Sequence, residues 1–102
     1  MLSEEEYELV RQFFGGYFHE DWCLDAPNRR ELVALYMNQS GMTPEQLHSL
    51  SKAIGKYGER YPDDHELSDR LYRELGCCYM PSADGLSAHQ WLETIARQLL
   101  EN

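Results

Sequence analysis

Apolar side chains recur at steps of three and four residues along most of the chain, a period typical of amphipathic helices. The first helix is predicted to begin after Ser3, because its hydroxyl can cap the backbone while Glu6 reaches back in a capping box. The pair Gly15-Gly16 interrupts the apolar positions that follow. Glycine tolerates the backbone conformation that ends a helix. The pattern therefore predicts a stop or kink at this pair, followed by a tight, partly helical connection over residues 17–22.

Four further segments repeat this period, and residues that start or end helices mark their boundaries. Their predicted spans are about Pro27 to Ser40 with Asp25 as a cap, Thr43 to Gly58, Asp63 to Leu75, and Ser87 to the end of the chain. Capping boxes are predicted at Thr43 and Ser87. No stretch alternates apolar and polar positions as a β-strand does. The chain is therefore predicted to be all-α, a compact single-domain bundle of about five helices spanning residues 1–102.

The amino-acid composition and net charge indicate what kind of partner the chain binds. The chain has 102 residues, of which 42% are hydrophobic, and this suffices for one buried core. Its formal net charge is −9, from 18 acidic and 9 basic residues. Such a surface repels nucleic-acid phosphates and anionic membranes, and it attracts a basic protein. We therefore expect a basic protein partner and no direct binding to nucleic acid or membranes.

The opening segment and the cysteines bear on location and chemistry. Residues 1–6 are acidic and lack the basic and apolar regions of a signal peptide, so we expect a cytoplasmic protein. The odd count of cysteines (Cys23, Cys77 and Cys78) then predicts free thiols. The adjacent pair could supply a nucleophile, but nothing in the sequence places a histidine beside it, and free cysteine is usually buried. No metal-ligand spacing occurs, and neither a metal nor a cofactor is predicted.

The acidic residues fall into two blocks. Residues 1–25 carry a net charge of −6 and residues 61–102 carry −5, around a middle segment of +2. Acids on turns beside helices are best placed to reach a partner, because loops project from a rigid scaffold. The predicted partner-binding residues are Asp63, Asp64 and Glu66, with Asp25 and Asp84 behind them.

Two alternatives to this binding patch stay open. The interface could lie on the acidic face of the opening helix, around Glu4, Glu5 and Glu8. The acids could also be ordinary solubility charge, or could serve only to complement the positive ends of helix dipoles.

A segment at residues 17–22 concentrates aromatic side chains, a histidine and two acids. This density is typical of a packed corner, in which His19 and Trp22 bury their rings and hydrogen-bond through their ring N–H groups. The alternative is an acid–base pair of His19 with Glu20 or Asp21. The residues predicted to form the structural corner are Tyr17, Phe18, His19, Asp21 and Trp22.

Three strings together resemble the helical immunity proteins of bacterial contact-dependent growth inhibition. They are Phe-Phe-Gly-Gly-Tyr-Phe-His-Glu-Asp-Trp at 13–22, Leu-Gly-Cys-Cys-Tyr at 75–79, and Gly-Leu-Ser at 85–87 followed by Trp-Leu at 91–92. The first is the most specific, although Glu20 stands where glutamine is more frequent. Cys78 stands where an aromatic residue is common. The strings occur in the family's order, and the resemblance covers nearly the whole chain.

The resemblance implies a cytoplasmic monomer that binds a toxin domain one-to-one and catalyses nothing. The toxin would be the C-terminal domain of a large surface protein delivered by a neighbouring cell. Many such toxins are nucleases with basic clefts, which an acidic binder fits. The resemblance assigns no binding residue. Two other classes stay open: a small helical enzyme that uses His19 or the cysteine pair, and a helical adaptor that binds peptides through the methionines at 37, 42 and 80.

Overall fold

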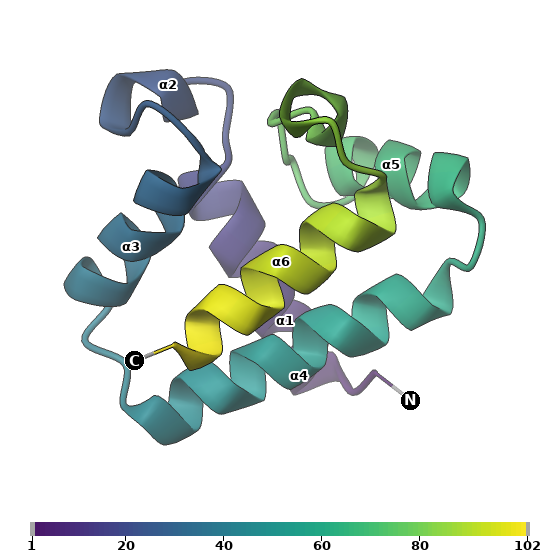
Figure 1. Ribbon diagram of the computed structural model, residues 1–102. Coiled ribbons are helices and arrows are strands. Elements are labelled where there is room, and N and C mark those ends of the chain that lie inside the picture. The colour runs from purple at the N-terminus through teal and green to yellow at the C-terminus, as the bar shows by residue number, and fades with distance from the viewer. Residues whose placement is uncertain (1, 102) are drawn as a thin grey trace.

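The computed structural model describes residues 2–101, apart from the side chains of residues 25, 82 and 83. Within these residues the chain forms six α-helices, one short 3-10 helix and no strand, which confirms the all-α prediction (Figure 1). The elements are α1 (Glu4–Tyr17), α2 (Trp22–Asp25), α3 (Arg29–Gln39), α4 (Pro44–Arg60), α5 (Asp64–Arg73), η1 (Pro81–Asp84) and α6 (Ala88–Leu100).

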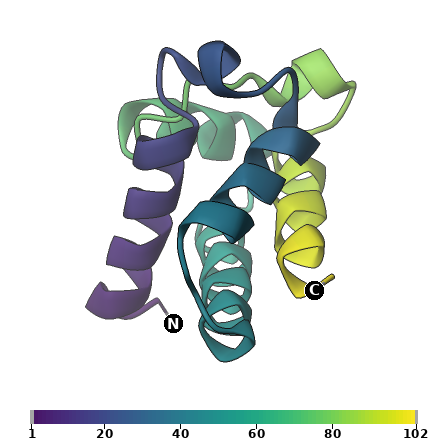
Figure 2. The same cartoon turned by 90° about the vertical axis from the view of Figure 1, so that its left-hand side faces the viewer.

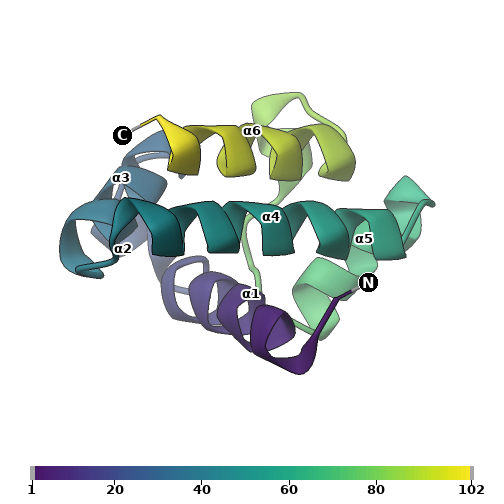
Figure 3. The same cartoon turned by 90° about the horizontal axis from the view of Figure 1, so that it is seen from below.

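The longest helix, α4, lies at the centre of the arrangement. Seen from below, α6 runs along one side of α4 and α1 lies on the other (Figure 3). The chain directions of α4 and α6 are opposite (Figure 1). Three parts of the chain lie together at one end of the molecule (Figures 1 and 2). They are α2, η1 and the segment that follows α5. No helix in the described part of the chain is long and apolar enough to cross a membrane.

An aromatic cluster around Trp91 fills the core. The Trp91 side chain is fully buried, and its ring centroid lies 5.4 Å from that of Phe18, 5.4 Å from that of Tyr79 and 5.9 Å from that of Phe14. These partners come from α1, from the residue that follows it and from the segment between α5 and η1. Trp91 therefore packs the end of α1 and the segment between α5 and η1 against α6.

The structure confirms three predicted helix starts. Ser3, Thr43 and Ser87 each cap a helix, and each forms a complete capping box with the residue three positions later. In a capping box, two backbone N–H groups that would otherwise lack partners are satisfied reciprocally. The starts of α1, α4 and α6 were therefore readable from local sequence alone.

The predicted stop or kink at Gly15-Gly16 is wrong, because α1 continues to Tyr17. Neither glycine has a positive φ angle, so neither adopts the conformation that ends helices. Gly15 has a different role. A Cβ atom at this position would lie 3.3 Å from the carbonyl oxygen of Leu75. The bare backbone of Gly15 therefore allows the turn after α5 to approach α1 closely.

The predicted start of the second helix near Pro27, with Asp25 as its cap, is also wrong. Asp25 belongs to α2, a four-residue helix that the sequence did not predict and that overlaps the predicted partly helical connection over residues 17–22 only at Trp22. Ala26 is extended, and α3 begins after Asn28, whose side chain accepts a hydrogen bond from the Glu31 N–H at 3.0 Å. Asparagine is as good a cap as aspartate. The N-cap of α3 is therefore Asn28, although Asp25 followed by Pro27 had indicated an earlier start.

The aromatic corner differs in detail from the expectation. Phe18 is fully buried, whereas His19 and Trp22 are only partly buried. Trp22 lies over Tyr79 with ring centroids 4.5 Å apart, and His19 Nδ1 accepts a hydrogen bond from the Asp21 N–H at 3.0 Å. These contacts shape the turn between α1 and α2. The buried anchor of the corner is thus Phe18 rather than Trp22.

Replacing Trp91 by alanine should lower the free energy of unfolding by about 3–5 kcal/mol, the usual loss when a buried aromatic site is emptied. Trp22→Ala should cost less, because part of the Trp22 ring remains in water in the folded protein. Urea denaturation followed by circular dichroism measures both values. Equal losses for the two variants would contradict the assignment of Trp91 as the centre of the core.

Candidate interaction surfaces

Asp64 and Asp63, at the start of α5, have different tasks. Asp63 caps α5 by accepting a hydrogen bond from the His65 N–H at 3.1 Å, and its side chain is exposed. The two carboxylate oxygens of Asp64 instead accept hydrogen bonds from the backbone N–H groups of Ala88 at 3.0 Å and His89 at 2.9 Å. These two donors belong to the first turn of α6. Asp64 therefore ties α5 to α6 and is turned toward the protein.

Asp84 also has partners within the protein. Its carboxylate accepts a hydrogen bond from the Tyr79 hydroxyl at 2.8 Å and lies 3.5 Å from Arg29 Nε. The Asp25 side chain lies outside the described residues. Of the predicted binding set, the structure thus leaves Asp63 and Glu66 exposed close together on the first turn of α5, and it engages Asp64 and Asp84 in holding the fold.

His89 completes the tie between α5 and α6. Its Nδ1 lies 2.8 Å from the Asp64 carboxylate, and its Nε2 lies 2.8 Å from the Tyr61 carbonyl oxygen and 3.2 Å from that of Gly58. No pattern in the sequence signalled this contact, because the partners are 25 to 31 residues away.

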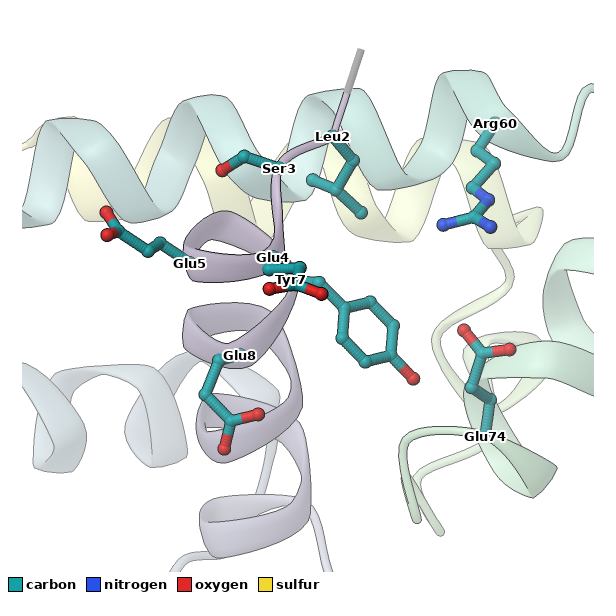
Figure 4. Close-up of a pocket in the computed structure, with 8 residues that line it drawn as sticks. All are labelled: Leu2, Ser3, Glu4, Glu5, Tyr7, Glu8, Arg60 and Glu74. Atoms are coloured by element: carbon teal, nitrogen blue, oxygen red, sulfur yellow. The ribbon is translucent and has the colours of Figure 1, made fainter.

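A broad hollow of about 680 Å³ lies on the surface at the start of α1 (Figure 4). We call it the N-terminal hollow. Figure 4 shows the Tyr7 ring extending from α1 toward Glu74, with Arg60 across from it at the end of α4. The hollow is wide open to solvent. Its lining residues are Leu2, Ser3, Glu4, Glu5, Tyr7, Glu8, Arg60 and Glu74.

Two side-chain contacts hold the walls of the N-terminal hollow in place. Glu6 accepts a hydrogen bond from Lys56 Nζ at 2.7 Å, which pins the start of α1 to α4. This contact, with the capping bonds to Ser3, lowers the pKa of Glu6 to about 2. On the other side, the Tyr57 hydroxyl donates to Glu74 Oε1 at 3.1 Å. Burial, reinforced by the Glu74 carboxylate, raises the pKa of Tyr57, so the hydroxyl stays a donor.

The N-terminal hollow is negatively charged. Four carboxylates line it and only one guanidinium, that of Arg60, opposes them. Glu8 is paired with Arg11, and Glu74 lies 3.5 Å from Arg70. Glu4 and Glu5 are exposed and form no ion pair with the other described residues. With Tyr7 and Leu2 as its apolar parts, this hollow is suited to a cationic side chain on a partner, which carboxylates and an aromatic face both attract.

The cysteines lack the surroundings of a catalytic nucleophile. Cys77 is buried as predicted, and burial raises the pKa of its thiol to about 12. The thiol lies 3.7 Å from the Tyr79 carbonyl oxygen, whereas Cys23 is exposed and Cys78 is intermediate. Since the thiolate is the reactive form, Cys77 is inert near neutral pH. Among the described residues, no group of three or more metal-ligating side chains could hold a metal ion.

The methionines do not gather on one surface. Met37 and Met42 are partly buried and pack against the core, and the Tyr36 hydroxyl donates to Met42 Sδ at 2.7 Å. Met80 is 58% exposed. Two of the three methionines that an adaptor would use for a peptide groove are therefore engaged in internal packing.

Comparison with known proteins places the chain among immunity proteins. Residues 6–99 match the family model described as CdiI immunity protein. No curated protein and no solved structure matches the chain. The match spans all six helices except the first two residues of α1 and the last residue of α6.

Replacing Asp64 by asparagine should lower the free energy of unfolding by about 1 kcal/mol, because an amide offers one acceptor oxygen to the two N–H groups of α6. Glu66→Gln on the same turn should change it by no more than about 0.5 kcal/mol, since that side chain is exposed. Thermal and urea unfolding measure both. If Asp64→Asn is as stable as the wild type, Asp64 does not act as the tie described above.

The cysteines should differ sharply toward iodoacetamide in the folded protein. Exposed Cys23 should be alkylated, and Cys77 should stay unmodified until urea unfolds the chain, because its thiol is buried and protonated. Mass spectrometry of proteolytic fragments locates each adduct. Alkylation of Cys77 as fast as that of Cys23 would show an activated thiol.

Proposed function

Because the chain belongs to the CdiI immunity protein family, we propose that it binds the cognate C-terminal toxin domain of a contact-dependent growth inhibition effector and blocks it. The protein would act in the cytoplasm, as a monomer that binds its toxin one-to-one, and without catalysis. The family match over residues 6–99 is the observation that carries this proposal.

The partner we propose is a basic toxin domain, in particular a nuclease. The chain's net charge of −9 favours association with a positively charged surface and disfavours competition by nucleic acid for the immunity protein. A nuclease binds the phosphate backbone in a basic cleft. Carboxylates that occupy such a cleft would replace phosphates and exclude the substrate.

The N-terminal hollow is our first candidate for the toxin contact. Its unpaired acids, Glu4 and Glu5, project from the first turn of α1, and Tyr7 supplies an aromatic surface beside them. Interfaces of this kind draw affinity from aromatic anchors and specificity from charge. Asp63 and Glu66 on α5 form the second candidate, with Asp25 retained from the original set. Asp64 and Asp84 would act on the interface only by holding the fold.

An enzymatic role has weaker support. The His19 ring accepts a backbone hydrogen bond in the turn before α2, and the Cys77 thiol is protonated. A general base needs a free nitrogen within reach of a substrate proton, and a nucleophile needs an accessible thiolate. The arrangement therefore favours binding over catalysis.

The test is binding of the cognate toxin domain, encoded next to the immunity gene, by the double variant Glu4→Gln with Glu5→Gln. Its association rate at low salt should fall by about tenfold, because exposed charges at an interface mainly steer association. The difference should shrink as salt screens the charges. Surface plasmon resonance over a salt series measures both effects.

The matched control is Glu31→Gln with Glu45→Gln, which removes two first-turn glutamates from α3 and α4. Glu45 lies at the opposite end of α4 from the N-terminal hollow. If only Asp63→Asn with Glu66→Gln slows association, the contact is on α5. If every pair behaves like the wild type, neither acidic surface contacts the toxin. If wild-type protein neither binds the toxin nor protects cells, the proposed function is wrong.

A further inference from the structure

His89 lies where three helices meet, and the polar atoms of the described residues that contact its ring are all acceptors. Nδ1 contacts the Asp64 carboxylate, while Nε2 contacts the carbonyl oxygens of Tyr61 and Gly58. The contacts come from the first turn of α5, the residue after α4 and the last turn of α4. The ring itself belongs to the first turn of α6. One side chain thus connects all three helices.

The protonation state of His89 follows from this geometry. A neutral imidazole has one N–H and one lone pair, so one nitrogen would direct its lone pair at a carboxylate or a carbonyl oxygen. Only the imidazolium, which has two N–H groups, donates on both sides. A charged donor to a carboxylate also forms the stronger hydrogen bond.

The charges around His89 favour the imidazolium as well. Asp64 faces it from α5, and the shallow hollow of about 440 Å³ beside the ring is also lined by Glu59 of α4 and Glu93 of α6. No lysine or arginine is among the described residues that line this hollow. The Glu93 carboxylate is itself paired with Arg97, and Asp64 is the acid in direct contact with the ring.

We propose that His89 is a proton-dependent clamp: as an imidazolium it holds the end of α4 and the starts of α5 and α6 together, and its deprotonation loosens this corner. The proposal does not depend on the toxin-binding function. It concerns the stability of the fold and the rigidity of the α5 turn that carries Asp63 and Glu66.

The direction of the pH effect follows from linkage. Partial burial lowers the pKa of His89, but the hydrogen bonds to Asp64 and to the two carbonyl oxygens outweigh it, and the net pKa lies above the usual 6.5. The clamp's contribution to stability is therefore full below the pKa of the unfolded chain and is lost as pH rises through the folded pKa. For Asp64, burial opposes the hydrogen bonds from α6, which prevail and lower its pKa, so Asp64 stays ionised throughout this range.

The proposal is tested by nitrogen-15 NMR of the histidine rings and by thermal unfolding across the alkaline side of neutrality. Both His89 ring nitrogens should be protonated near neutral pH, and the ring should titrate above the ordinary histidine pKa of 6.5. The unfolding midpoint of the wild type should fall as pH rises through that titration. His89→Gln should lose this dependence, and His48→Gln, the matched control on α4, should keep it.

Two results would overturn the proposal. A His89 ring that carries a single N–H at pH 6.5, the ordinary histidine pKa, would mean that the imidazolium is not favoured. An unfolding midpoint that depends on pH equally in the wild type and in His89→Gln would mean that another group controls the effect. The ring spectrum of the wild-type protein decides the first point even if His89→Gln does not fold.

Discussion

Burial of Trp91 is the constraint on which the rest of the fold depends. Its indole ring belongs to α6, yet the rings around it come from α1, from the residue after α1 and from the segment that leads to η1. Local helix formation cannot bring these parts together, because Phe14 and Phe18 lie more than sixty residues before Tyr79 and Trp91. Once they pack on Trp91, α4 is enclosed between α1 and α6, and the surfaces described above acquire fixed walls.

The acidic residues around this apolar core fall into two groups, which differ in whether they bond to other parts of the chain. Glu6, Asp64 and Asp84 each join segments that are distant in sequence, through Lys56, the first turn of α6, and Tyr79 with Arg29. Glu4, Glu5 and Glu66 have no such bonds to other described residues and face solvent. The net charge of the chain therefore overstates how much acidic surface is available to a partner. The exposed acids without such bonds include Glu4 and Glu5 at the start of α1 and Glu66 on the first turn of α5, and also Glu31, Glu45 and Glu59 elsewhere on the surface.

Features that depend on interactions between near neighbours in the chain could be predicted from the sequence. Features that depend on contacts between distant residues could not. Capping boxes at Ser3, Thr43 and Ser87 involve residues three positions apart, so their helix starts could be read directly. The role of Gly15 depends on the carbonyl of Leu75, sixty residues later, and the pattern alone favoured a helix end. The same reason explains why Asp64 was assigned to a surface: its partners in α6 cannot be inferred from its neighbours. The N-terminal hollow appeared only as an acidic helix face, because Arg60 and Glu74 complete it from elsewhere.

Four consecutive residues at the start of α1 have two different roles. Two of them stabilise the fold, and the two between them are exposed on the surface. Ser3 and Glu6 cap the helix and pin it to α4, while Glu4 and Glu5 between them are exposed and line the open hollow. A substitution at position 4 or 5 leaves the cap and the ion pair intact. The charge of the hollow can therefore change by one substitution at a time, and no variant along the way loses the fold. Under the proposed function, this turn is a place where recognition of the toxin can change while the scaffold stays the same.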